Sequence, residues 1–295
     1  MGDQTLEYNW LIWRILKLAA AILRVLFIGG VTKHFPENLP PVGPALIGVN
    51  HSTTAEEAGG VFHVEEGHIS MLYKKELEER DNPFKWVSAK VRKFFLKREL
   101  GEVDNPLKWV FAKVSKFFLR GAGFVPTRRE VRETTAIDMT VQALHQGWRI
   151  MAMPEGTSRG HDGLIYAKRR GTQRIAMQVD CPVIPVAVEG GKGALWDGLR
   201  SYFFLAKKHD LVICYGLPFR FSDLGLNLEN DPSGERATFE LMVRIGAMLP
   251  KRLRGYYTDG VDQFLASDAP DAEFYRKLQR KEVEDGELTD SKLAV

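Results

Sequence analysis

Short apolar runs alternate with amphipathic stretches along most of the chain. Runs of strand length occupy residues 44–49, 68–73, 149–153, 181–188 and 210–216. Apolar residues at helical spacing characterise residues 130–147, 172–179 and 236–249. Helices that alternate with apolar strands predict an α/β domain whose sheet is covered on both faces. Because prolines mark its ends, the run at residues 181–188 is predicted to be an edge strand or a segment leading into the sheet.

The first apolar stretch, residues 8–31, is interrupted by Arg14, Lys17 and Arg24, so it lacks the uncharged length of a membrane-spanning helix. At helical spacing these three side chains fall within about 80° of one another, on one side of a wide apolar helix. This pattern is typical of a helix that lies in the membrane interface, with its basic groups toward anionic headgroups. The alternative is an N-terminal helix packed on the protein's own core.

A segment of basic amphipathic character occurs twice. Residues 81–97 and 104–120 are identical at 13 of 17 positions, at an offset of 23. Each copy opens with Asp-Asn-Pro, and proline is accepted in the first turn of a helix. Residues 81–120 hold ten basic and four acidic side chains, which predicts a pair of helices suited to a membrane surface. Two core-packed helices with solvated lysine faces fit the pattern equally well.

Composition excludes several classes of protein. The 295 residues are 44% hydrophobic and 27% charged, as in ordinary globular proteins, and the net charge of +3 is too small to indicate a nucleic-acid binder. Cys181 and Cys214 lie in apolar stretches, which predicts buried thiols in a reducing compartment. No Cys/His spacing of the zinc-binding kind occurs, so no metal is expected. The polar, acidic residues 278–295 predict a disordered tail.

The candidate chemistry lies at strand ends. His51 stands two positions after the last residue of the run at residues 44–49, and Glu56 comes about one helical turn after His51. A carboxylate in that place can hold an imidazole in one tautomer and leave its other nitrogen as a base, although a loop histidine beside a capping box fits the same residues. Residues 154–160, after the run at residues 149–153, can form a backbone N–H nest for an anion such as phosphate. Open α/β sheets place ligands at such strand ends.

Four stretches, in this order, resemble the motifs of the glycerolipid acyltransferases, typified by 1-acylglycerol-3-phosphate acyltransferase. His51 and Glu56 occupy the positions of that family's first motif, His-x4-Asp. The second motif is matched by Lys-x-Glu-Leu at residues 74–77 and by Arg128 after a short strand, and the third by Pro-Glu-Gly-Thr at residues 154–157. The proline-flanked strand at residues 181–188 resembles the fourth. The resemblance covers roughly residues 30–257.

The resemblance implies transfer of a fatty acyl group to the hydroxyl of a lysophospholipid such as 1-acylglycerol-3-phosphate. Acyl-CoA or acyl carrier protein would be the thioester co-substrate, with no further cofactor. His51 would be the general base, oriented by Glu56. Glu155 would contact acceptor hydroxyls or fix its loop. The acceptor-binding residues implied are Lys74, Arg128, Glu155, Gly156, Thr157 and Arg159.

The same resemblance implies a mixed sheet flanked by helices, in a peripheral or monotopic protein on the cytoplasmic face of an anionic membrane. The expected organisation is an interfacial membrane helix (residues 1–31), an acyltransferase domain (residues 32–257) that includes the duplicated helices (residues 81–120), and a C-terminal extension with a disordered tail (residues 258–295).

The sequence departs from the family's pattern in three places. Glu56 stands where the family has aspartate, the pair Ser158-Arg159 is reversed, and one 23-residue copy of the repeat lengthens the second motif. Two other readings stay open, the first because acceptor choice depends on pocket shape and the second because of Glu56 and the reversed pair. One is an acyltransferase with a different lysolipid acceptor, and the other is a catalytically silent membrane-binding homologue.

Overall fold

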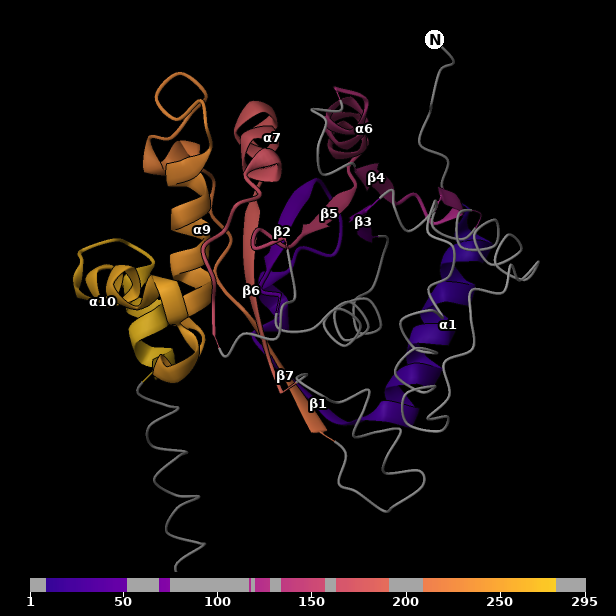
Figure 1. Ribbon diagram of the computed structural model, residues 1–295, viewed down its shortest axis with the longest axis horizontal. Coiled ribbons are helices and arrows are strands. Elements are labelled where there is room, and N and C mark those ends of the chain that lie inside the picture. The colour runs from indigo at the N-terminus through magenta and orange to yellow at the C-terminus, as the bar shows by residue number, and fades with distance from the viewer. Residues whose placement is uncertain are drawn as a thin grey trace, which may run out of the picture. The chain divides into compact units, whose positions relative to one another are not determined.

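The computed structural model of the chain describes residues 9–51, 69–74, 117, 120–127, 134–156, 163–190 and 209–279 (Figure 1). Glu56, Arg128, Thr157, Arg159 and nearly all of the repeat lie outside the described residues. The chain divides into two compact units. The first comprises Met1–Leu16 and Ser70–Thr140, and the second comprises Lys17–Ile69 and Val141–Val295.

In the first unit, the start of helix α1 (Trp10–Phe27) packs on residues 120–127. The Asn9 side chain caps the helix by accepting hydrogen bonds from the backbone N–H groups of Leu11 (3.0 Å) and Ile12 (3.2 Å). Ile12 and Trp13 are buried, and a Cβ on Gly121 would lie 2.2 Å from the Ile12 Cδ1. The buried side of α1 therefore needs a glycine opposite it.

The same unit contains a parallel pair of strands, β3 (Ile69–Lys74) and β4 (Val125–Thr127). The pairing is in register, so that Lys74 lies opposite Thr127. The hydroxyl of Ser70 donates a hydrogen bond to the backbone oxygen of Gly123 (2.6 Å), and both residues are buried. The predicted strand at residues 68–73 is thus present.

Helix α1 passes directly into strand β1 (Ile28–His34), although the apolar run predicted one helix as far as residue 31. Two consecutive glycines, Gly29 and Gly30, and the β-branched residues beside them disfavour a helix here. The Asp210 side chain accepts a hydrogen bond from the Gly30 N–H (2.6 Å), close to an irregularity in the pairing of β1 with β7 (His209–Tyr215). Pairing in the sheet therefore ends the helix at Phe27, although the apolar run of the sequence continues beyond it.

The second unit is built on a mixed sheet with the strand order β1-β7-β6-β2-β5. Pairing is parallel between β1 and β7, between β6 and β2 and between β2 and β5, whereas β6 and β7 are antiparallel. This agrees with the predicted α/β class. The strands besides β1 are β2 (Ala45–Val49), β5 (Arg149–Ala152), β6 (Val183–Glu189) and β7 (His209–Tyr215).

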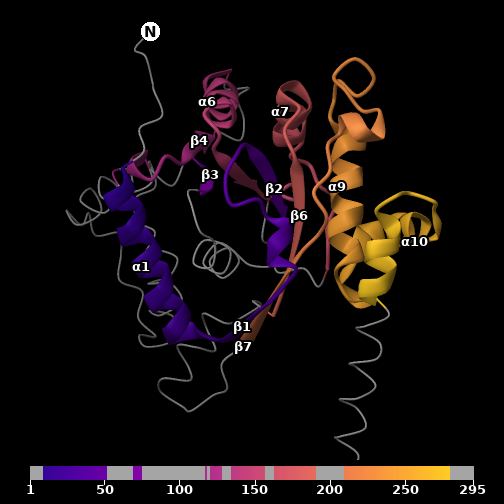
Figure 2. The same cartoon turned by 180° about the vertical axis from the view of Figure 1, so that it is seen from behind.

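Helices cover this sheet at the predicted places. All five residues of β2 are buried, and a Cβ on Gly48 would lie 2.6 Å from the Leu241 side chain, so Gly48 permits the close approach of α9. Figures 1 and 2 show α9 running alongside β6. The helices are α6 (Thr134–His145), α7 (Gly171–Val179), α9 (Glu235–Ala247) and α10 (Thr258–Ala266), and the short 3-10 turns are Pro36–Asn38, Ser222–Leu224, Lys251–Leu253 and Gly255–Tyr257.

Strand β6 lies inside the sheet, and the prediction that residues 181–188 form an edge segment is wrong. Pro185 lies opposite Gly48 of β2, and its oxygen accepts a hydrogen bond from the Gly216 N–H (2.8 Å). Regular pairing with β7 begins only at Val186, after an isolated bridge between Val183 and Phe219. The missing N–H of Pro185 thus falls in an irregular stretch of the ladder, where an interior strand can accept proline.

The C-terminal helices enclose a buried cation. The Arg244 side chain, 1% exposed, forms ion pairs with Asp271 (2.6 Å) and Glu240 (2.6 Å), between the rings of Phe219 and Phe264. Burial by itself would lower the pKa of Arg244, but the hydrogen bonds and charges of the two carboxylates raise it. Residues 258–279 therefore pack against α9, with helical residues from 272 to 279 after α10, and residues 280–295 lie outside the described chain.

Candidate active site

His51 and Glu155 meet at the carboxyl ends of two neighbouring parallel strands. Gly48 near the end of β2 lies opposite Ala152 at the end of β5. The backbone N–H of His51 donates a hydrogen bond to the Glu155 Oε2 at 2.6 Å, and the Glu155 side chain is 5% exposed. A short bond from an N–H to a carboxylate is among the stronger hydrogen bonds in proteins. This bond fixes the backbone that carries the His51 imidazole.

The Asn50 side chain joins the end of β2 to the neighbouring strand β6 by hydrogen bonds. Its Nδ2 donates a hydrogen bond to the Val188 oxygen (2.9 Å), and its Oδ1 accepts one from the Val188 N–H (2.7 Å). The side chain is buried, and this two-way pair continues the β2–β6 ladder beyond Val49, the last strand residue. His51, which is half-buried, therefore leaves a rigid strand end.

The second oxygen of Glu155 holds another part of the chain. Its Oε1 accepts a hydrogen bond from the Ile165 N–H at 3.1 Å. Residues 163–170, here called the connecting segment, lead from the predicted anion loop to α7. Each carboxylate oxygen thus accepts one backbone N–H group, one from His51 and the other from Ile165 in the connecting segment. Fixing a loop is one of the two roles that the sequence left open for Glu155.

Gly156 adopts a conformation that side chains disfavour. Its φ is +67°, and a Cβ at this position would lie 2.4 Å from the Arg169 Cγ. The Gly156 N–H donates to the Met153 oxygen (3.0 Å), and the Arg169 N–H donates to the Pro154 oxygen (3.0 Å). The turn after β5 is therefore closed against the connecting segment, and glycine is required there.

The remaining predicted residues cannot all be placed beside His51. Lys74 ends β3 in the other unit, opposite Thr127. Arg128 follows Thr127 in sequence, and Thr127 is the last residue of β4. The positions outside the described residues are those of Glu56, Arg128, Thr157 and Arg159. Among the described residues, no three His, Cys, Asp or Glu side chains gather as they would around a metal ion.

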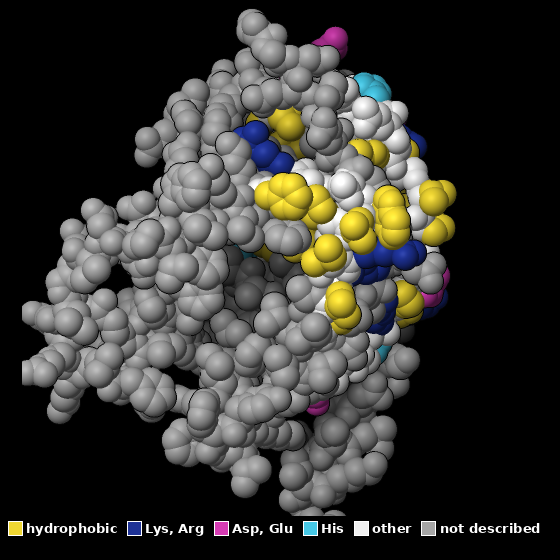
Figure 3. Space-filling model, turned by 90° about the vertical axis from the view of Figure 1, so that its right-hand side faces the viewer, with side chains coloured by type: hydrophobic (Ala, Val, Ile, Leu, Met, Phe, Trp, Pro, Cys, Tyr) yellow, Lys and Arg dark blue, Asp and Glu magenta, His cyan; other side chains and the backbone are white. Residues whose placement is uncertain are grey.

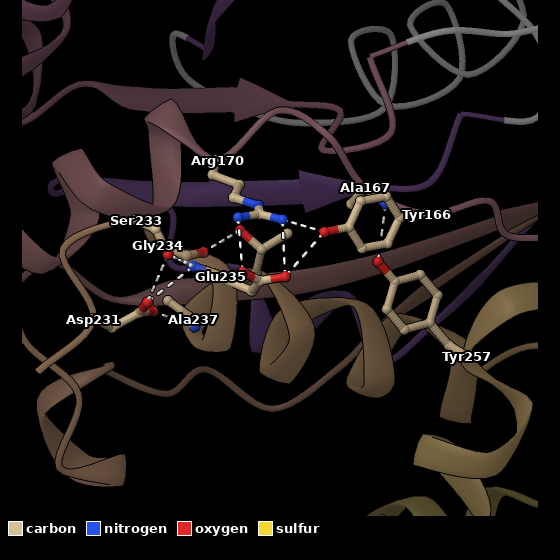
Figure 4. A network of polar contacts seen from close by, with 10 residues as sticks. Tyr166, Ala167, Arg170, Asp231, Ser233, Gly234, Glu235, Ala237 and Tyr257 are labelled. Atoms are coloured by element: carbon tan, nitrogen blue, oxygen red, sulfur yellow. Dashed lines mark hydrogen bonds and ion pairs between the residues drawn. The ribbon is translucent and has the colours of Figure 1, made fainter.

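A polar network supports the connecting segment from α9 (Figure 4). Arg170 forms an ion pair with Glu235 (2.9 Å) and donates a hydrogen bond to the Tyr166 hydroxyl, which in turn donates to Glu235 (3.0 Å). Asp231 accepts hydrogen bonds from the backbone N–H groups of Glu235 (3.0 Å) and Ala237 (2.8 Å), which caps α9. The connecting segment is thereby joined to a helix whose N-terminus is capped.

Sequence reasoning missed Asn50 and the connecting segment. Asn50 had a recognisable signal, because a polar residue that directly follows a buried strand must satisfy its amide at the sheet edge. The connecting segment had none, since Ile165 is an ordinary apolar residue that contributes only its backbone N–H. Because every residue except proline has a backbone N–H group, no sequence motif can identify such a donor.

The 1-acyl-sn-glycerophosphate acyltransferase PlsC of Thermotoga maritima is similar in structure, with a TM-score of 0.47 and 17% identity over 78% of this chain and 79% of that one. No curated protein matches the chain.

The model of the acyltransferase family matches residues 30–189, which is more than half of the chain. The match includes His51 at the end of β2, the Glu155 turn after β5 and the whole of β6. It therefore covers the strand ends at which the polar contacts converge. On this evidence the chain belongs to the acyltransferase family.

Proposed function

We propose that this acyltransferase moves a fatty acyl group from acyl-CoA or acyl carrier protein to the hydroxyl of a lysophospholipid such as 1-acylglycerol-3-phosphate. The observation that carries the proposal is the hydrogen bond between the His51 N–H and the Glu155 carboxylate. It supports an imidazole held at the carboxyl edge of the sheet, where α/β proteins bind ligands. Family membership favours this reading over a silent membrane-binding homologue.

In the proposed reaction His51 is the general base. Its imidazole removes the proton of the acceptor hydroxyl while the hydroxyl oxygen attacks the thioester carbonyl carbon. A new C–O bond forms, the C–S bond breaks, and the thiolate leaves with the proton returned by the imidazolium. Glu56, about one helical turn after His51 in sequence, is proposed to orient the ring, as a longer substitute for the family's aspartate.

The acceptor oxygen is proposed to attack directly, without an acyl-enzyme intermediate. The one Gly-x-Ser-x-Gly run, residues 156–160, lies in the stretch that the resemblance assigns to the acceptor phosphate, so its serine is not proposed as a nucleophile. Burial raises the pKa of the Cys181 thiol to about 11, which keeps it protonated and unreactive at neutral pH. The other cysteine, Cys214, is buried within β7.

The acceptor phosphate is proposed to bind Lys74, Arg128 and Arg159, because cationic side chains suit a dianionic group. The backbone around Gly156 and the hydroxyl of Thr157 would complete this pocket. Support comes from the register of β3 and β4, which sets Lys74 opposite the residue that precedes Arg128. Glu155, with both oxygens engaged by backbone N–H groups, is proposed to fix the loop.

The proposed activity is tested by acyl transfer in mixed detergent micelles. Purified protein is given lysophosphatidic acid and a long-chain acyl-CoA, and the lipid products are identified by mass spectrometry. Phosphatidic acid formed in proportion to enzyme is the expected result. A parallel panel replaces the acceptor by other lysophospholipids and the donor by an acyl carrier protein thioester. Product from a different acceptor alone would correct the headgroup, and no product from any pair would refute the proposal.

We also propose that α1 docks the protein on the cytoplasmic face of an anionic membrane as a peripheral or monotopic element. Trp10, Leu11, Ile15 and Leu18 are exposed, and the Arg14 guanidinium lies 4.7 Å from the centre of the Trp10 ring. Figure 3 shows hydrophobic side chains next to basic ones on one face of the described residues. Within the described residues, no helix is both long enough and apolar enough to cross a bilayer.

Charged residues on the exposed side of α1 are expected to weaken membrane binding. The double variant Leu11→Glu/Leu18→Glu should partition into vesicles of phosphatidylcholine and phosphatidylglycerol at least about tenfold less than the wild type, because two apolar side chains are lost and two like charges are added. Vesicle flotation measures this. Point variants are preferable to truncation, since removal of residues 1–31 would take part of β1 with it.

The matched control for this experiment is Val42→Glu. Val42 is 81% exposed in the loop before β2, compared with 62% for Leu18 on the helix. The control tests whether any exposed apolar residue matters or only those on α1. Equal flotation of the wild type and the double variant would remove α1 from the membrane-binding surface.

A further inference from the structure

We propose that Tyr257 is a positioning residue for acyl transfer, which acts on His51 through the connecting segment and the Glu155 carboxylate. The inference rests on the function proposed above and adds a residue that none of the four motifs contains. Tyr257 ends a 3-10 turn (Gly255–Tyr257) before α10 and is buried. Its hydroxyl oxygen accepts a hydrogen bond from the Ala167 N–H at 3.0 Å (Figure 4).

The connecting segment is held by its backbone at two further points. The Leu164 N–H donates to the Leu253 oxygen (2.9 Å), and the Leu164 oxygen accepts a hydrogen bond from the Tyr256 N–H (2.9 Å). Two glycines allow this approach of backbone to backbone. A Cβ on Gly255 would lie 2.1 Å from the Leu164 oxygen, and a Cβ on Gly163 would lie 3.0 Å from the Leu253 oxygen.

The anchored segment then holds the site. Ile165 stands between the two anchored residues Leu164 and Ala167, and its N–H donates to the Glu155 Oε1 (3.1 Å). The Glu155 Oε2 accepts the His51 N–H (2.6 Å). A continuous series of hydrogen bonds and short backbone links therefore runs from the Tyr257 hydroxyl to the residue proposed as the base.

The chemical state of Tyr257 suits this role. Burial raises the pKa of its hydroxyl to about 12, although the Ala167 N–H opposes the shift, and the negative charge of Glu155 raises the pKa further. The hydroxyl is therefore protonated at neutral pH, and it lies within electrostatic reach of Glu155. A neutral hydroxyl can anchor the segment without repelling the carboxylate.

The test is the variant Tyr257→Phe, which removes the hydroxyl and keeps the ring. The loss of one acceptor leaves the Ala167 N–H without its partner, so the connecting segment should open more readily. Selective 15N labelling of the seven histidines gives few backbone amide signals, and His51→Ala identifies the one from His51. Amide exchange at His51 is expected to be about fivefold faster in Tyr257→Phe, the factor that a lost neutral hydrogen bond gives.

Two references separate positioning from a general loss of stability. Tyr275→Phe makes the same chemical change at a buried tyrosine outside the connecting segment, and it should leave His51 exchange unchanged. His34, the last residue of β1, reports opening at a strand end outside the connecting segment within each sample. Unchanged exchange at His51 in Tyr257→Phe, or an equal acceleration at His34, would overturn the proposal.

The second readout is catalytic. In Tyr257→Phe, kcat for acyl transfer is expected to fall about fivefold with the KM values for acceptor and donor unchanged, because the base is displaced while substrate contacts remain. Full activity in Tyr257→Phe would overturn the proposal. The exchange measurement needs no substrate, so it decides the role of Tyr257 even if the wild type transfers no acyl group and the proposed function fails.

Discussion

His51→Ala is expected to abolish nearly all acyl transfer while the protein stays folded. A positioned general base contributes about 10²- to 10⁴-fold to the rate, and kcat should fall by a factor in that range. The fold should persist because the contact with Glu155 is made by the backbone N–H, which alanine retains. The measurement is kcat with the best acceptor from the panel, together with the thermal midpoint of each protein.

The matched control is His145→Ala. His145 is an exposed histidine at the end of α6, and its replacement should change neither the rate nor the midpoint. If His51→Ala and His145→Ala both retain wild-type kcat, His51 is not the base. A loss of activity accompanied by a large fall in the midpoint of His51→Ala would contradict the separation of imidazole chemistry from backbone structure.

Glu155→Gln is expected to damage both stability and activity. Both oxygens of Glu155 accept backbone N–H groups, but a glutamine side chain offers one oxygen and one NH2 group. Whichever way the amide turns, one buried N–H faces a donor and loses its acceptor. Such a loss at a charged acceptor costs about 2–3 kcal/mol of unfolding free energy. Because the His51 corner is released at the same time, kcat should fall at least about tenfold.

Glu189→Gln is the control for this change. Glu189 also ends a strand, β6, but its partner is Arg252, an exposed side chain at 2.5 Å. An ion pair with an exposed partner contributes under about 1 kcal/mol, so this variant should be close to the wild type in urea unfolding. If instead Glu155→Gln kept full stability and raised only the KM of the acceptor, Glu155 would bind acceptor hydroxyls and would not fix the loop.

Much of the site could be predicted because its parts follow buried strands. The run before His51 and the run before Glu155 are both short and apolar, and the carboxyl ends of parallel strands lie at the same edge of a sheet. Two separate motifs could therefore be expected at one edge. The role of Glu155 could not be chosen, because it depends on which backbone groups point at the carboxylate.

Other features could not be predicted because periodicity reports burial and not partners. The prolines of residues 181–188 favoured an edge segment, whereas an irregular ladder lets β6 lie inside the sheet. The apolar run through residue 31 favoured one helix, whereas pairing with β7 makes its end a strand. Tyr257 and Ala167 are 90 residues apart in sequence, so no local sequence pattern predicts their hydrogen bond.

The buried Arg244 limits how far the protein can be shortened from its C-terminus. Its guanidinium depends on Asp271, which lies well beyond residue 189, the last residue that the family model matches. A gene fragment cut between Arg244 and Asp271 would leave the buried guanidinium with Glu240 as its one remaining counter-ion among the described residues. The segment that must be expressed as one piece is thus longer than residues 30–189, the segment by which the family is recognised.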